Sequence, residues 1–170
     1  LGNNGSGKTN FLNGLSVLNE LITINRNSKN PSRYRLPAVP FLLSNETKNA
    51  PSSIEVAFHT AGYCYTYSIS WLPDYIVSEK LLRKEGKRKE KLIYTRDFSK
   101  EKDIVIVTFP NGSTISAHVQ EIINQNILRY SSVISIYDSM NFECEDISNV
   151  YNYFRFVDLW NVKKYELSSM

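Results

Sequence analysis

The sequence predicts an α/β fold in which a glycine-rich loop and a helix come first, an antiparallel β-subdomain follows, and helices close the chain. Three observations support this order: a glycine-rich run at residues 2–9, apolar residues at helical spacing directly after it, and a period of two from residue 54 onward. The chain has 170 residues, 42% of them hydrophobic and 12% aromatic, which suffices for the buried core of one domain. We assign residues 1–24 to the loop and helix, 25–52 to a connecting loop, 53–117 to the β-subdomain and 118–170 to a mainly helical segment.

The glycine-rich run matches the phosphate-binding pattern G-x-x-x-x-G-K-[ST] at every fixed position. Glycines let such a loop curl until its backbone N–H groups point at phosphate oxygens, where a Cβ would obstruct the approach. We expect Lys8 to reach the β- and γ-phosphates and the hydroxyl of Thr9 to bind Mg²⁺. The predicted ligands are therefore ATP and Mg²⁺, and the predicted nucleotide-binding residues are Gly2, Asn3, Asn4, Gly5, Ser6, Gly7, Lys8, Thr9 and Asn10.

A helix should begin near Lys8, because apolar residues recur at i, i+4, i+7 and i+11 on one face: Phe11, Leu15, Leu18 and Ile22, with Leu12 widening the stripe. The positive end of its dipole would add to the attraction for phosphate. The other interpretation, a glycine-rich turn before an ordinary helix, is disfavoured because the matching run leads at once into a helix, as the binding mechanism requires. The apolar stripe itself is predicted to be core.

A phosphate-binding loop normally follows a buried parallel strand, and only Leu1 stands in that place. We therefore expect the domain to be incomplete. The sequence has no initiating Met, no signal peptide and no apolar run long enough to cross a bilayer, so we expect the intact protein to be cytoplasmic and not bound to a membrane. Cys64 and Cys144 are predicted to be reduced thiols, and His59 a half-exposed strand residue without a metal-binding role.

The middle of the chain is predicted to form an antiparallel meander. Residues 25–49 are rich in Asn, Ser and Pro and should form a long loop. Alternating strands are predicted at 54–59 and 63–71, then at 76–82, 92–94 and 104–109, with a last strand at 113–116 across a Pro-Asn-Gly turn. The tyrosine-rich strand 63–71 is expected to pack in the core, although its rings could instead stack on nucleic-acid bases.

A basic run occupies residues 83–91, where six basic and two acidic residues give a local charge of +4 against +3 for the whole chain. It is predicted to be a solvated hairpin tip, with a phosphate-contacting finger as the alternative. Towards the end, Val119, Ile122, Ile123 and Ile127 predict a helix, and Tyr151, Phe154, Val157 and Leu159 suggest another.

Residues 132–138 could form a strand, and they imitate the apolar strand whose final Asp holds Mg²⁺ in phosphate-loop enzymes. We disfavour that role because Ser139 stands where a catalytic Glu would follow and Ser135 interrupts the apolar run. No catalytic residue is assigned.

With these residues in view, positions 2–12 resemble the nucleotide loop of the ATP-binding-cassette-like ATPases that include RecF, SMC and overcoming-lysogeny-defect proteins. The nearest resemblance is to bacterial AAA-family ATPases linked to abortive infection and other anti-phage systems. Weaker similarity follows at residues 37–41, 54–56 with 65–67, and 76–81 with 94–96.

The resemblance implies the first lobe of a P-loop NTPase, with an antiparallel β-subdomain over the nucleotide, ATPase activity in the intact protein and a head-to-tail homodimer. A nucleic acid or an effector subunit is a possible further partner. Family members also carry an Asp-Glu pair, a Ser-Gly signature segment and a switch histidine, and we find none of them in this sequence. The Mg²⁺-sensing glutamine of such ATPases would be Gln120 or Gln125. We therefore expect ATP binding with negligible hydrolysis, and the alternative is a module that binds nucleic acid or a partner through the basic hairpin and the aromatic sheet.

Overall fold

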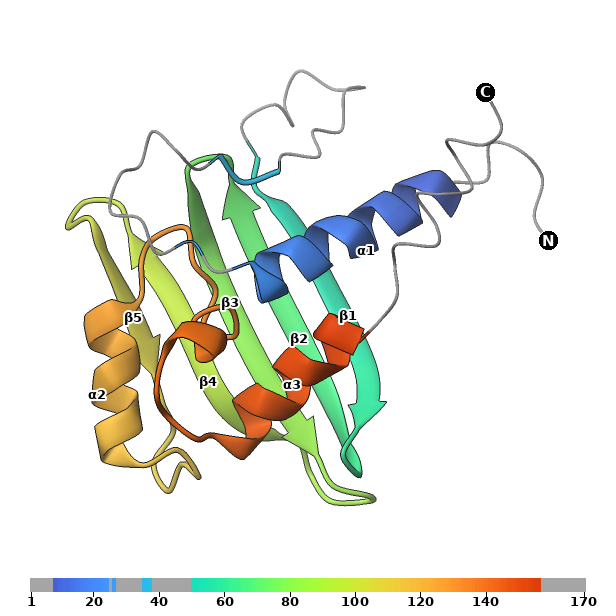
Figure 1. Cartoon of the computed structure of the whole chain (residues 1–170), viewed down its shortest axis with the longest axis vertical. Helices are drawn as coiled ribbons and strands as arrows, with labels where there is room; N and C mark the ends of the chain where they lie inside the picture. Colours follow the sequence, from blue (N-terminus) through green and yellow to red (C-terminus); the bar gives the residue numbers. More distant parts are fainter. Residues whose placement is uncertain (1–7, 25, 27–34, 38–49, 157–170) are drawn as a thin grey trace.

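The computed structural model describes residues 8–24, 26, 35–37 and 50–156, which form one antiparallel sheet, three α-helices and a short 3-10 helix (Figure 1). The sheet has the order β1-β2-β3-β4-β5, so each strand pairs with its neighbour in the chain. The strands are β1 (Ser52–Thr60), β2 (Tyr63–Leu72), β3 (Tyr75–Lys84), β4 (Lys91–Ser99) and β5 (Ile104–Thr108). The helices are α1 (Lys8–Thr23), α2 (Ala117–Asn126), η3 (Tyr137–Ser139) and α3 (Glu145–Phe156).

The predicted antiparallel meander is confirmed for these five strands. Ala61 and Gly62 make the tight β1–β2 turn with positive φ angles of 50° and 82°, and the register then places Phe58 opposite Tyr65. Strand β4 is longer than the three residues predicted, because the charged Arg96 occupies an inward position and interrupts the apolar alternation.

The strand predicted at 113–116 is wrong. After the turn at 110–112, closed by a 3.0 Å bond from the Ser113 N–H to the Pro110 carbonyl, these residues lead into α2. The hydroxyl of Ser113 accepts from the Ile115 N–H, and Ser116 caps α2 by accepting from the Val119 N–H. Serine side chains that bond to nearby backbone favour caps and turns over a strand ladder, which explains the difference.

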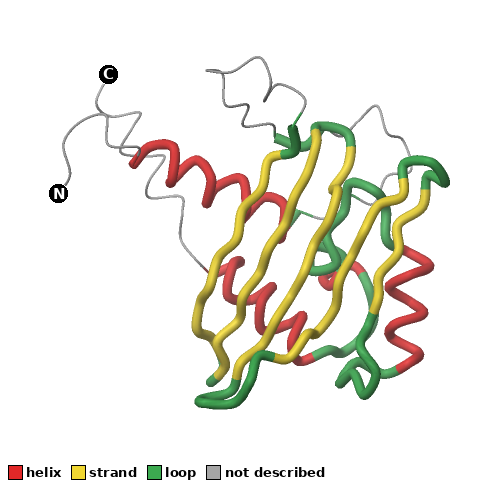
Figure 2. Tube along the Cα trace, turned by 180° about the vertical axis from the view of Figure 1, so that it is seen from behind, coloured by secondary structure: helices red, strands yellow, loops and turns green. Residues whose placement is uncertain are grey.

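The helices α1 and α3 cover one face of the sheet, and α2 lies beside β5 (Figure 1). Seen from behind, the opposite face carries no described helix (Figure 2). The tyrosine-rich strand β2 turns its aromatic side chains to the covered face, where Tyr65, Tyr67 and Trp71 are buried. The core-packing prediction for this strand is therefore confirmed, and these rings are not available to stack on bases.

The helices bury much of the face that the sequence predicted for each, although Leu12 and Leu15 of the α1 stripe are only half-buried. Leu18, Leu21 and Ile22 of α1 are fully buried, and Val119 and Ile123 of α2 pack against the sheet. Helix α3 buries Ile147, Val150, Tyr151 and Phe154. The predicted continuation through Val157 and Leu159 lies outside the described residues.

Residues 132–138 are not a strand. The run from Ser131 to Ile136 is buried but irregular, and it ends in η3, where Asp138 is exposed. Its backbone is engaged by side chains: the Val133 N–H donates to Glu79, and the Ser135 N–H donates to the Ser132 hydroxyl. β-Branched residues favour a strand only where a neighbouring strand pairs with them, and no described strand lies beside this run.

The connecting loop is described only at Arg26, 35–37 and 50–51, and there it is anchored on the sheet. The Leu36 N–H donates to the Pro73 carbonyl at 2.8 Å, and the Trp71 indole donates to the Pro37 carbonyl at 2.7 Å. This part of the loop therefore lies against the β2–β3 turn.

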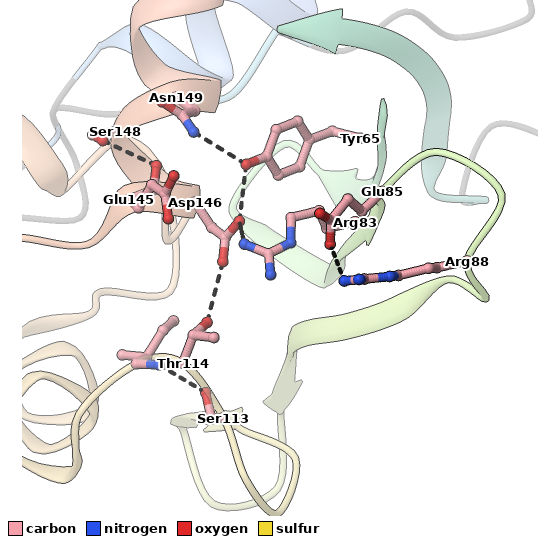
Figure 3. Close-up of polar contacts among 11 residues, drawn as sticks. Tyr65, Arg83, Glu85, Arg88, Ser113, Thr114, Glu145, Asp146, Ser148 and Asn149 are labelled. Carbon is pink, nitrogen blue, oxygen red and sulfur yellow. Dashed lines mark hydrogen bonds and ion pairs between the residues drawn. The ribbon is translucent and has the colours of Figure 1, made fainter. Parts of the chain in front are cut away.

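A buried carboxylate joins α3 to the sheet (Figure 3). Asp146, in the first turn of α3, accepts from Arg83 at 2.9 Å, from the Tyr65 hydroxyl at 2.8 Å and from Thr114 at 3.2 Å. Burial raises the pKa of Tyr65, so its hydroxyl stays a donor. The three partners come from β2, β3 and the segment before α2, so Asp146 ties three parts of the chain together.

We expect Asp146→Asn to lower the free energy of unfolding by about 2 kcal/mol, because charge-assisted hydrogen bonds are lost in a site that water hardly reaches. Asp103→Asn is the matched control: Asp103 also pairs with an arginine, Arg129, at 3.2 Å, but 69% of its side chain is exposed. Such a surface pair contributes at most about 1 kcal/mol. Chemical denaturation of both variants tests this, and an equal loss in the two would contradict a special role for Asp146.

Candidate nucleotide-binding site

Helix α1 begins at Lys8, directly after the glycine-rich run, as the sequence predicted. Its first turn therefore contains Lys8, Thr9 and Asn10, whereas Gly2, Asn3, Asn4, Gly5, Ser6 and Gly7 lie outside the described residues. The N–H groups of a first turn have no partner within the helix, and the helix dipole makes this end partly positive. No acidic side chain stands in the first turn to offset that charge. This end of α1 therefore favours an anion such as a phosphate.

Residues 18–22 fix α1 to the rest of the domain. Besides the buried apolar residues there, the Asn19 amide donates to the Phe154 carbonyl of α3 at 2.6 Å. The Ser132 hydroxyl donates to the Leu21 carbonyl at 2.8 Å. The helix is thus held by its C-terminal half.

The N-terminal half of α1 extends past β1, the edge strand, in both views (Figures 1 and 2). The helix crosses β1 near Gly14, where an added Cβ would lie 3.7 Å from Ile54 Cδ1, an ordinary contact. Leu12, Leu15 and Val17 are only half-buried. The described part of α1 before residue 18 therefore packs less closely on the sheet than its C-terminal half does.

A second polar cluster lies under the helices and was not predicted. Glu79, 1% exposed, accepts from the hydroxyls of Tyr67 at 2.9 Å and Tyr94 at 2.7 Å, and from the Val133 N–H at 2.9 Å. Burial raises the pKa of Glu79, and the attraction of Arg96 together with these hydrogen bonds offsets only part of that effect.

Arg96, the cation of this cluster, is fully buried. Its guanidinium donates to three backbone carbonyls, those of Ile76 at 2.6 Å, Arg129 at 2.9 Å and Leu128 at 3.3 Å. Burial lowers the pKa of Arg96, while the nearby Glu79 opposes that shift. The pair thus fastens the irregular segment after α2 to strands β3 and β4.

Residues 131–133 connect this cluster to α1. The Val133 N–H binds Glu79, and the adjacent Ser132 hydroxyl binds the Leu21 carbonyl in the last turns of α1. The Ser131 hydroxyl donates to the Arg26 carbonyl just beyond the helix. The consecutive residues Ser132 and Val133 therefore link the last turns of α1 to Glu79 by hydrogen bonds.

Other predicted residues do not join the start of α1. Gln120 donates to the Ile115 carbonyl and Gln125 to Glu121, so both serve α2 itself. Helix α2 lies at the β5 edge of the sheet, whereas α1 begins beyond β1 at the opposite edge (Figure 1). Neither glutamine is placed to sense Mg²⁺ at the start of α1 in this arrangement.

The cysteines and histidines stand apart. Cys64 and Cys144 are free and half-buried, and His59 is exposed at the end of β1. Within the described part of the chain, no group of three or more His, Cys, Asp or Glu side chains could hold a metal ion.

Sequence reasoning missed Glu79, Arg96 and Asp146. A signal for the first two was present: Glu79 shares its strand face with Leu81, and Arg96 shares its face with Tyr94, so each charged residue occupies an inward position. Asp146 carried no comparable signal, because its partners are distant in the chain.

Comparison with known proteins identifies the family of the chain. Residues 1–152 match the sequence model of a protein family described as "AAA domain, putative AbiEii toxin, Type IV TA system". This chain belongs to that AAA family. The match spans the glycine-rich run, all five strands, α1, α2 and most of α3. It confirms the resemblance to AAA-family ATPases linked to abortive infection.

An AAA domain implies nucleotide binding in general, and the family description places such domains in a toxin–antitoxin setting. No curated protein and no solved structure matches the chain. Among the described residues, no helix is long and apolar enough to cross a membrane.

The raised pKa of Glu79 predicts a pH dependence. Below its ordinary pKa of 4.5 the carboxyl is protonated in both the folded and the unfolded chain, so the contribution of Glu79 to the free energy of unfolding is at its maximum. As pH rises above 4.5, the unfolded chain ionises first, so the free energy of unfolding falls until the folded-state pKa is passed. The slope from this one group is at most about 1.4 kcal/mol per pH unit.

Glu79→Gln should remove this decline in the free energy of unfolding. As the pH rises, the wild type should therefore lose stability relative to the variant. Glu55→Gln, on an exposed position of β1, is the control and should follow the wild-type curve. Urea denaturation from pH 4 to pH 8 measures all three. A wild type that instead gained stability relative to Glu79→Gln over this range would show that Arg96 outweighs desolvation.

Proposed function

We propose that this AAA domain binds ATP together with Mg²⁺ at the start of α1, as the N-terminal part of an ATPase that serves anti-phage defence. The observation that carries the proposal is the continuity of the phosphate-binding pattern with a helix that begins at its lysine, free of acidic residues in the first turn. Membership of the AAA family supports it.

In this proposal the backbone of residues 2–7 holds the phosphates, and Lys8 places its ammonium group between the β- and γ-phosphates. The hydroxyl of Thr9 is the protein ligand of Mg²⁺, and Asn10 extends the first turn. Bound Mg²⁺ neutralises part of the phosphate charge. These residues fit the ligand because the helix end is positive and its first turn holds no acidic residue.

Hydrolysis requires groups beyond this site. In phosphoryl transfer, catalysis consists of positioning and charge stabilisation, with a residue that orients the attacking water. Asp138 ends the run at residues 132–138 that imitates the Mg²⁺-binding strand of phosphate-loop enzymes, and its side chain is exposed in η3. We propose that a homodimer of the intact protein completes the site, and that this chain alone binds ATP without turnover.

The alternative function is a module that contacts nucleic acid or a partner through the basic hairpin and the aromatic sheet. The structure favours the hairpin for such a contact and disfavours the aromatic sheet. Tyr65 and Tyr67 are in the core. The hairpin residues 84–91 are exposed, so of these two surfaces the hairpin remains available for such a contact.

Lys8→Ala should abolish binding of Mg²⁺·ATP in isothermal titration calorimetry of the full chain. Loss of two charge-assisted hydrogen bonds of about 1.5–3 kcal/mol each corresponds to a weakening of about 100-fold or more. Lys100→Ala, which removes an exposed lysine from the β4–β5 turn, is the control and should bind as wild type. Unchanged binding by Lys8→Ala would refute the site, and steady phosphate release by the wild-type chain would refute the need for a completing partner.

Thr9→Ala should reduce the dependence of ATP binding on Mg²⁺ more than it reduces binding itself. The comparison is the ratio of ATP affinities with Mg²⁺ and with a chelator, measured for wild type, Thr9→Ala and Thr108→Ala, the last on an exposed position of β5. The ratio should fall towards one in Thr9→Ala only. If Thr9→Ala kept the wild-type ratio, the threonine would not be the metal ligand.

A further inference from the structure

The β3–β4 hairpin carries the net charge of the whole chain. Residues 84–91, here called the basic tip, contain five basic and two acidic side chains, which give +3. The chain as a whole also has +3, so all other residues together are neutral. The basic residues of the tip are Lys84, Lys87, Arg88, Lys89 and Lys91.

Every residue of the basic tip is exposed. Arg88 pairs with Glu85 at 2.6 Å, and among the described residues the four lysines take part in no ion pair. Arg83, the next residue along β3, is different: its side chain is 14% exposed and is neutralised by Asp146. The positive charge is therefore concentrated at the end of the hairpin and is largely uncompensated.

The base of the hairpin is fixed. Strand pairing continues to Arg83 and Lys91, and Arg83 is held both by Asp146 and by the ring of Tyr63, 4.6 Å from its guanidinium carbon. Gly86, with a φ of 53°, makes the turn. The tip lies at the end of the sheet next to the β1–β2 turn (Figures 1 and 2). A cationic group on a fixed projection loses little conformational freedom on binding.

The turn at the opposite end of the sheet provides a contrast. Between β4 and β5, Lys100, Glu101, Lys102 and Asp103 alternate in sign and sum to zero. Such mixed charge is sufficient to solvate a turn. The one-sided charge of the basic tip therefore calls for a different explanation.

We propose that the basic tip binds the sugar–phosphate backbone of a nucleic acid. Lysines act as point charges for phosphates, and five cations within eight residues match a ligand with regularly repeated negative charge. The tip has no apolar side chain to insert into a lipid surface, which disfavours a membrane. The contact does not include base stacking by Tyr65 or Tyr67, because both rings are buried.

The test compares two double variants of the full chain with equal loss of charge. Lys87→Gln with Lys89→Gln neutralises the basic tip, and Lys100→Gln with Lys102→Gln neutralises the turn at the opposite end. Binding of a fluorescently labelled single-stranded oligonucleotide and of the corresponding duplex is measured by anisotropy over a range of salt concentrations. No ATP is present, so failure here is distinct from failure of the proposed nucleotide site.

We expect the tip variant to bind about tenfold more weakly at low salt, and the slope of log affinity against log salt to fall by about two, because two phosphate contacts are lost. The variant of the opposite turn should retain the wild-type affinity and slope. Both variants should unfold at the wild-type temperature, since all four lysines are exposed. Equal weakening in both variants, no binding by the wild type, or binding to anionic vesicles but not to nucleic acid would overturn the proposal.

Discussion

Glu79 and Arg96 are buried on the covered face of the sheet, and the chain around them has to supply hydrogen bonds that water would otherwise provide. Glu79 takes its partners from two tyrosines of neighbouring strands and from the backbone at Val133. Arg96 takes its partners from carbonyls of residues 76, 128 and 129. The irregular segment after α2 is therefore held against the sheet by charge-assisted hydrogen bonds, although it contributes no strand.

The same segment determines how α1 sits on the domain. Ser131 and Ser132 bind carbonyls at the end of α1, while apolar residues of its last turns fill the core. The half of α1 that follows the phosphate-binding pattern extends past the sheet edge (Figure 1). The C-terminal half of α1 thus provides stability, and its N-terminal end belongs to the proposed nucleotide site. Residues 131–133 link the end of α1 to the buried Glu79 through hydrogen bonds.

The two faces of the sheet also divide their roles. The covered face holds nearly all the large aromatic side chains of β2, and the opposite face presents small hydroxyl residues such as Ser68, Ser70 and Ser78. Net charge is confined to one end of the sheet, in the basic tip. The proposed sites for nucleotide and for polyanion therefore lie in separate parts of the domain, α1 and the β3–β4 hairpin. Asp146 connects them only structurally, by tying Arg83 at the base of the hairpin to α3, which in turn contacts α1.

The sequence by itself determined the features that depend on local order: a helix directly after the phosphate-binding pattern, and the β1–β2 hairpin, where a period of two meets a tight turn. It also indicated the family, because the pattern at residues 2–9 has fixed spacing. At residues 113–116, local hydrogen bonds of Ser113 and Ser116 favoured a turn and a helix cap over a strand. Only the tertiary structure decided that residues 132–138 form no strand, since β-branched content makes a strand only when a partner strand is present. It likewise decided that Glu79, Arg96 and Asp146 are buried, because each is stabilised by groups far away in the chain that no local pattern can bring together.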